Sequence, residues 1–108
     1  MTHSFLPEKM LKVHGERTLT LYTSCLNELK EELDALHHLL ANPADSMEPK
    51  IKLHNMMGIA RILYDEELIV RIIQLQVNFK VGGPTLDSDE YKWIARELDD
   101  RLMTLAEA

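Results

Sequence analysis

His54 lies in residues 50–61, a segment whose apolar spacing predicts a helix. At about 100° per residue, Lys50, Gly58 and Arg61 fall on the histidine's own face, within roughly an 80° arc. The apolar residues of this region gather on the opposite face: Leu53, Met56, Met57, Ala60 and Leu63. We therefore expect an exposed imidazole, which is largely neutral at pH 7 and can act as a nucleophile. The flanking cations suit an incoming phosphoryl group.

The outward flank of this helix also has the features of a protein-docking surface. Ile51 and Ile62 lie there beside Asn55, although they point away from the expected core. Apolar side chains beside a polar reactive group favour contact with another protein. Gly58, one turn beyond His54, costs about 1 kcal/mol relative to alanine in a helix interior. It leaves a notch through which a partner could approach the imidazole.

The composition limits the classes of function. A chain of 108 residues, 45% hydrophobic, predicts a single domain over residues 1–108. Its formal net charge of -6 opposes binding to nucleic acid or an anionic membrane, so we expect protein partners. The single Cys25 cannot form an internal disulfide and has no CxxC companion. The start at Met1 lacks a secretion signal and no stretch is long enough to span a membrane, so we expect a free-standing cytoplasmic protein.

Glycine and proline separate a series of predicted helices. A short leading helix covers residues 5–13, and a leucine seam predicts a long helix over 16–41. Asp45 with Glu48 and Asp87 with Glu90 resemble capping boxes for the His54 helix and the last helix, which ends near Leu105. Asp65 can cap a helix over residues 66–81. The β-branched residues of that segment leave a strand as an alternative, which its length and periodicity disfavour.

Four such helices joined by short loops predict an all-α fold. We expect an antiparallel up-down-up-down four-helix bundle, with the short N-terminal helix capping one end.

The segment 54–60, His-Asn-Met-Met-Gly-Ile-Ala, resembles a motif of the histidine-containing phosphotransfer (HPt) domains of two-component phosphorelays. That family's pattern is histidine, any residue, an apolar residue, lysine, glycine, then small residues. His54, Met56, Gly58 and Ala60 match it, whereas Met57 replaces the usual lysine. The resemblance covers roughly residues 19–105 and includes the order of helices.

The resemblance implies that His54 accepts a phosphoryl group from an aspartyl phosphate and passes it to a second receiver domain. The protein would then be a carrier in signal transduction and not an enzyme, without a cofactor or metal of its own, because the receiver supplies Mg²⁺. Gln76 matches a glutamine that holds the imidazole in some members. With Met57 in place of lysine, Arg61 and Lys50 are the available cations. The implied partners are a response-regulator receiver domain and a hybrid sensor histidine kinase, bound by a monomer.

Other functions remain open on the sequence. An HPt-like bundle that lost transfer with the lysine would be an adaptor or inhibitor, and an unrelated helical adaptor would use Ile51 and Ile62 without His54. Adjacent His37 and His38 point about 100° apart, so we expect no metal site there. The apolar residues Val70, Val77 and Val81 leave a dimer open.

Overall fold

The computed structural model of the chain describes residues 6–41, 48–80 and 88–107. Its helices are α1 (Glu8–His14), the 3-10 helix η1 (Gly15–Arg17), α2 (Thr18–Ala41), α3 (Glu48–Ile62), α4 (Glu66–Lys80) and α5 (Asp89–Glu107). No strand occurs in the described ranges, so the all-α prediction is confirmed for them. The strand alternative for the β-branched segment is wrong over residues 68–80, which lie in α4.

The chain reverses between α1 and α2 at Gly15. This residue has φ 57°, a conformation that glycine adopts without a steric penalty. The buried Thr18 hydroxyl donates to the carbonyl oxygens of Met10 (3.1 Å) and Gly15 (2.8 Å), which ties the two helices together. The long helix therefore begins at Thr18, two residues later than the leucine pattern predicts. The leading helix begins at Glu8, and Phe5 lies outside the described residues.

The joint between α3 and α4 is only three residues long. Tyr64 has φ 54°, a left-handed conformation that costs energy for a residue other than glycine, and its N–H donates to the Arg61 carbonyl (3.1 Å). The carboxylate of Asp65 then accepts the N–H of Leu68 at 3.0 Å. The predicted helix cap at Asp65 is thereby confirmed.

The start of α5 differs from the prediction. The Ser88 hydroxyl accepts the N–H of Tyr91 at 3.2 Å, so Ser88 takes the capping role that the sequence analysis gave to Asp87. Both residue types suit an N-cap. An N-cap side chain accepts the N–H of a residue two or three positions later, and Ser88 lies three positions before Tyr91. Asp87, Asp45 and Val81 lie outside the described residues.

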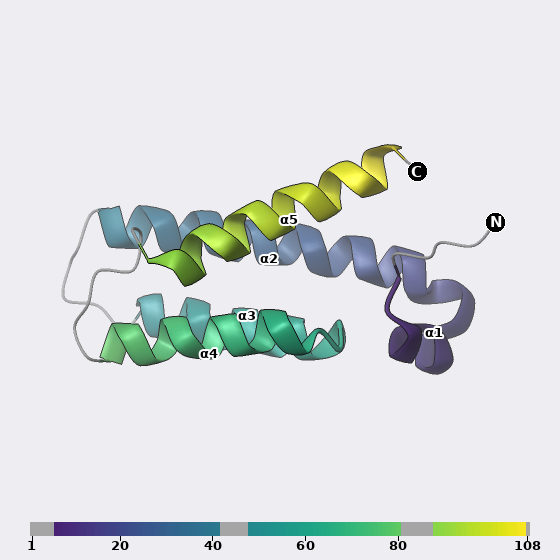
Figure 1. Cartoon of the computed structure of the whole chain (residues 1–108), viewed down its shortest axis with the longest axis horizontal. Coiled ribbons are helices and arrows are strands. Elements are labelled where there is room, and N and C mark those ends of the chain that lie inside the picture. The colour runs from purple at the N-terminus through teal and green to yellow at the C-terminus, as the bar shows by residue number, and fades with distance from the viewer. Residues whose placement is uncertain (1–5, 42–47, 81–87, 108) are drawn as a thin grey trace.

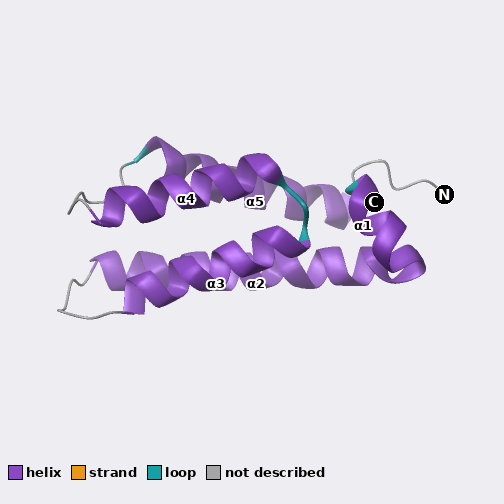
Figure 2. Cartoon of the chain, turned by 90° about the horizontal axis from the view of Figure 1, so that it is seen from below, coloured by secondary structure: helices purple, strands orange, loops and turns teal. Residues whose placement is uncertain are grey.

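The four longer helices pack around a shared core. α2 packs against α3 and α5, and α4 packs against the same two helices (Figures 1 and 2). The short α1 packs against α2, at the end of the molecule near the N-terminus (Figure 1). None of the described helices combines the length and apolarity needed to cross a lipid bilayer.

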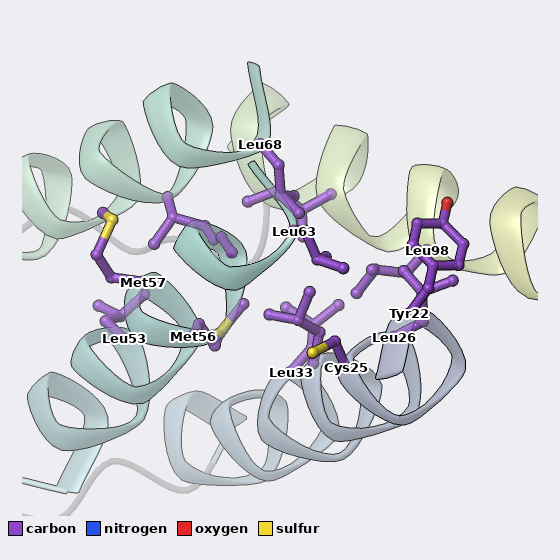
Figure 3. Packing of buried hydrophobic residues seen from close by; sticks show 14 of the residues in the cluster. Tyr22, Cys25, Leu26, Leu33, Leu53, Met56, Met57, Leu63, Leu68 and Leu98 are labelled. Atoms are coloured by element: carbon purple, nitrogen blue, oxygen red, sulfur yellow. The ribbon is translucent and has the colours of Figure 1, made fainter. Parts of the chain in front are cut away.

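Side chains from all four helices fill this core (Figure 3). Among its fully buried members are Leu26, Leu29, Leu33, Leu36, Leu53, Met56, Leu63, Leu68, Ile72, Leu75 and Ile94. The leucine seam of α2 faces inward as predicted, because spacings of three and four keep those residues on one face. This packing fixes which face of α3 is turned outward, and with it the position of His54.

Candidate functional site

His54 lies on the outward face of α3. Its side chain is exposed, whereas Leu53 and Met56 of the same helix are buried. Within the described residues, the imidazole takes part in no hydrogen bond or ion pair. The ring is therefore open to solvent and to an incoming molecule.

Two cations share this side of α3. Lys50 and Arg61 are both exposed, and neither forms an ion pair with any residue in the described part of the chain. They lie on either side of His54, about one turn before it and two turns after it along the helix. Their charges are thus available to an anionic group that approaches this face of α3.

Gly58 leaves open space beside the histidine. A Cβ atom built at this position would meet nothing within 4 Å. Packing within the described residues therefore gives no reason for a glycine here, although glycine weakens a helix interior. The notch forms part of a shallow depression of about 490 Å³, called here the His54 hollow, which is lined by Glu28, Glu32, His54, Asn55, Gly58, Ile59 and Ile62.

Two carboxylates on α2, Glu28 and Glu32, also line this hollow, and the helical period of α3 does not predict them. Glu32 lies 3.6 Å from the Lys52 ammonium and accepts the amide of Asn55 at 3.5 Å. Glu28 is exposed and makes no ion pair or hydrogen bond with the residues described. The cations predicted beside His54 lie on α3, and acidic groups on α2 lie next to them. A helical wheel of α3 alone could not show this, because the register between α2 and α3 is a tertiary property.

The charge of Glu28 also affects the Cys25 thiol, on the inner side of α2. Burial raises the pKa of the Cys25 thiol, and the nearby Glu28 carboxylate raises it further. A thiol held protonated in this way is a poor nucleophile. Cys25 is a free cysteine, buried in the core.

The two predicted docking isoleucines are exposed. Ile51 is 53% and Ile62 43% accessible, which is high for large apolar side chains. Ile62 borders the His54 hollow, while Ile51 borders a second depression of about 550 Å³, called here the Ile51 hollow. The second depression is lined by Ala35, His38, Leu39, Glu48, Ile51 and Lys52. Asn55, the remaining predicted binding residue, is exposed but bonded to Glu32.

Gln76 does not contact the imidazole through a hydrogen bond. It lies partly buried on α4, and it has no hydrogen-bond partner among the described residues. Its predicted role in orienting His54 therefore stays a prediction.

Met57 lies inside the molecule. It is 5% exposed and belongs to the core cluster together with Leu53 (Figure 3). The prediction that Met57 faces the core is confirmed. The position at which the resembling family has a lysine thus holds a buried thioether, and any cation near a phosphoryl group must come from elsewhere.

The remaining candidate groups lie away from His54. His37 Nδ1 lies 3.2 Å from the Tyr91 hydroxyl, and its ring meets that of His38 edge to face. In the part of the chain that the structure describes, no three metal-ligating side chains cluster. Another depression, of about 800 Å³, lies by the α3–α4 joint and is lined by the ion-paired Arg101 and Asp65.

No protein family model, no curated protein and no solved structure matches this chain. The functional argument therefore depends on the residues and their geometry.

Proposed function

We propose that this protein is a histidine phosphotransfer carrier, in which His54 relays a phosphoryl group between receiver-domain aspartates. In the first step an imidazole nitrogen attacks the phosphorus of an aspartyl phosphate on the partner. The new N–P bond forms as the acyl P–O bond breaks, and the aspartate leaves as a carboxylate. The proton on the other ring nitrogen either stays there or is released to solvent. The reverse step on a second receiver passes the group on.

One observation supports this proposal most strongly: an exposed, unbonded imidazole lies beside a glycine whose missing side chain leaves open space. A surface histidine without function needs neither feature. An acyl phosphate is already activated, so the carrier must mainly offer an accessible nucleophile and a surface for its donor. Mg²⁺ and most catalytic groups would belong to the receiver partner.

The proposed fold is an antiparallel up-down-up-down four-helix bundle capped by α1. The packing of α2 and α4 against both α3 and α5 supports it. In such a bundle, α3 and α4 form a hairpin around Asp65. Gln76 follows Asp65 by the same number of residues by which His54 precedes it, so the two would lie at one level. Gln76 could then orient the ring once a partner covers the site.

Lys50 and Arg61 are the proposed phosphate neighbours. Both are exposed on the side of His54 and free of internal ion pairs among the described residues. Arg61 has the longer reach, and its guanidinium can hold two phosphate oxygens at once. We place the protein between a hybrid sensor histidine kinase and a response regulator, as a cytoplasmic, single-domain monomer.

The test is transfer of labelled phosphate from a phosphorylated receiver domain to the protein. We expect a label on the wild-type chain that acid removes and base does not, as for phosphohistidine. His54→Gln should abolish it, while His14→Gln, a control on α1, should retain it. A label that persists in His54→Gln would refute the assignment.

The burial of Met57 favours a second candidate. Without a cation at that position, the protein could bind a receiver or kinase as an adaptor or inhibitor without carrying phosphate. The same labelling experiment separates the two functions. Receiver binding that is lost in Ile62→Glu, with no label on the wild type, would establish the adaptor.

A further inference from the structure

The surroundings of His54 carry charges of opposite sign on two helices. Lys50 and Arg61 are exposed on the side of α3 that bears the histidine, whereas α2 contributes the carboxylates of Glu28 and Glu32 to the His54 hollow. The two helices pack against each other (Figure 2). A group attached to His54 is therefore exposed to the charges of both.

The two carboxylates differ in how far a cation offsets them. Glu32 lies 3.6 Å from the Lys52 ammonium and accepts the Asn55 amide at 3.5 Å, so its charge is partly compensated within the protein. Glu28 is exposed, and no side chain in the described ranges forms an ion pair or hydrogen bond with it. Burial raises the pKa of the Cys25 thiol, and the charge of Glu28 raises it further. The field of Glu28 thus acts on a neighbouring ionisable group.

A phosphoryl group on His54 would be sensitive to this field. It adds nearly two negative charges at neutral pH. The axes of packed helices are about 8 to 10 Å apart, so a carboxylate of α2 and a phosphoryl group on α3 in the same hollow are about 10 Å apart. At that distance and at low salt, their repulsion changes an equilibrium about threefold.

Removal of the phosphoryl group relieves this repulsion. In hydrolysis, the oxygen of a water molecule bonds to phosphorus, the N–P bond breaks, and its electron pair returns to the imidazole nitrogen. One proton of the water passes to that nitrogen, and inorganic phosphate leaves. In transfer, the carboxylate of a receiver aspartate takes the place of the water. Both reactions remove negative charge from the hollow, so the Glu28 carboxylate should favour both.

We propose that Glu28 limits the lifetime of phosphohistidine at His54, so that the carrier passes its phosphoryl group on and does not store it. This role rests on the proposed function, because it concerns the phosphorylated form of the carrier. The buried thioether of Met57 adds no charge at the position where the resembling family has a lysine. Lys50 and Arg61 attract the phosphoryl group as it arrives, and Glu28 opposes its retention.

Chemical phosphorylation tests this role without a partner protein. Potassium phosphoramidate transfers its phosphoryl group to accessible histidines, and the label that is missing from His54→Gln is assigned to His54. After the reagent is removed, the half-life of this label is measured at pH 8 in about 10 mM salt. Glu28→Gln should lengthen the half-life about twofold relative to the wild type, and Glu28→Lys about fourfold.

Glu31→Gln is the matched control. Glu31 is an exposed glutamate of α2 that does not line the His54 hollow, so the variant changes the net charge equally and should keep the wild-type half-life. The differences should nearly vanish in about 0.5 M salt, where the Debye length is about 4 Å. A change in half-life that came from altered packing would persist at that salt concentration.

Equal half-lives of the wild type and Glu28→Gln at low salt, or a difference that salt does not reduce, would overturn the role of Glu28. So would an equal change in Glu31→Gln. Each of these results requires a label at His54 and leaves the proposed function intact. A His54 that takes no label in any variant would overturn both, because an accessible nucleophile would be missing. Transfer from a receiver domain is measured separately, so the two proposals can fail independently.

Discussion

His54 combines accessibility with a lack of internal bonds, and both follow from where core packing turns α3. The buried face holds Leu53 and Met56, which fixes the histidine on the outer side, where Gly58 adds an open notch. Because the notch costs helix stability without helping internal packing, filling it should have opposite effects on stability and on partner binding.

Gly58→Ala tests this opposition. The added Cβ meets open space, so the variant should be more stable than the wild type by about 1 kcal/mol in urea unfolding. The same methyl group should slow phosphoryl transfer from a receiver, and Gly58→Leu should slow it further. A variant that is less stable, or one that leaves transfer unchanged even as leucine, would contradict the role of the notch.

Arg61→Ala tests the proposed phosphate contact. Since Arg61 is exposed and has no ion pair with a described residue, stability should change by less than about 0.5 kcal/mol. Transfer to His54 should slow by about tenfold, because one charge-assisted contact to the phosphoryl group is lost. Arg96→Ala on α5, at an exposed arginine, is the control and should transfer normally. Equal rates in both variants would mean that another cation acts at the site.

Most of the outer face of α3 could be predicted from the sequence. The helical period places His54, Ile51 and Ile62 outward and Met57 inward, and the structure agrees. The carboxylates Glu28 and Glu32 could not be predicted as neighbours, because they come from α2, and no local rule gives the offset between two packed helices. The likeness of Gln76 to an orienting glutamine had the same weakness, and no hydrogen bond joins it to His54 in the described structure.

At the scale of elements, the α3–α4 joint connects the helix of the site to α4 and is tied to α5 through Asp65. Asp65 accepts the Leu68 N–H and also forms the ion pair with Arg101, while Arg101 Nε donates to Glu97 at 3.0 Å. The capping role of Asp65 could be predicted from the sequence, because Asp65 precedes an acidic first turn. The ion pair of Asp65 with Arg101 could not be predicted, because it depends on how α5 packs against the rest of the molecule.

Substitutions at Asp65 separate its two roles. Asp65→Asn keeps a capping side chain but removes the charge next to the largely buried Arg101, and we expect a loss of about 2 kcal/mol. Asp65→Ala removes the cap as well and should cost about 3 kcal/mol. Urea unfolding measures both. Glu67→Gln, which breaks the exposed pair with Arg71, is the control and should cost under about 0.5 kcal/mol. Equal costs at Asp65 and Glu67 would show that the Arg101 pair contributes no more than a surface pair.

At the scale of the whole molecule, charge is distributed unevenly around an apolar core. The chain is acidic overall, and the outer face of α2 contributes Glu28 and Glu31, while the site side of α3 bears free Lys50 and Arg61. Such a surface would meet the proposed phosphorylated partner with positive charge at the histidine and negative charge beside it. The partner is thereby oriented before contact, and its on-rate should fall as salt increases.

The core of the whole molecule also predicts how stability depends on alkaline pH. Burial raises the pKa of Tyr22 above 10.0, with Asp65 and Glu97 adding to the rise and Arg101 opposing it. Burial likewise raises the pKa of Tyr91, and Asp34 adds to it. For Lys30, burial alone would lower the pKa, but the carboxylates of Asp99 and Asp34 outweigh it and raise the pKa. In each case the folded state holds the proton more tightly than the unfolded state.

Stability should therefore begin to decrease near pH 9.0, the ordinary pKa of the Cys25 thiol, and decrease further as the pH rises through the raised pKa values of the tyrosines and Lys30. Urea unfolding at pH 9, 10 and 11 measures this decline. Tyr22→Phe removes the ionising hydroxyl from the buried end of α2, so the decline should become shallower, even though the variant loses the hydrogen bond with Arg101. Tyr64→Phe removes an exposed hydroxyl and should keep the wild-type slope. An equal decline in all three proteins would mean that the core tyrosine is not what couples folding to protonation.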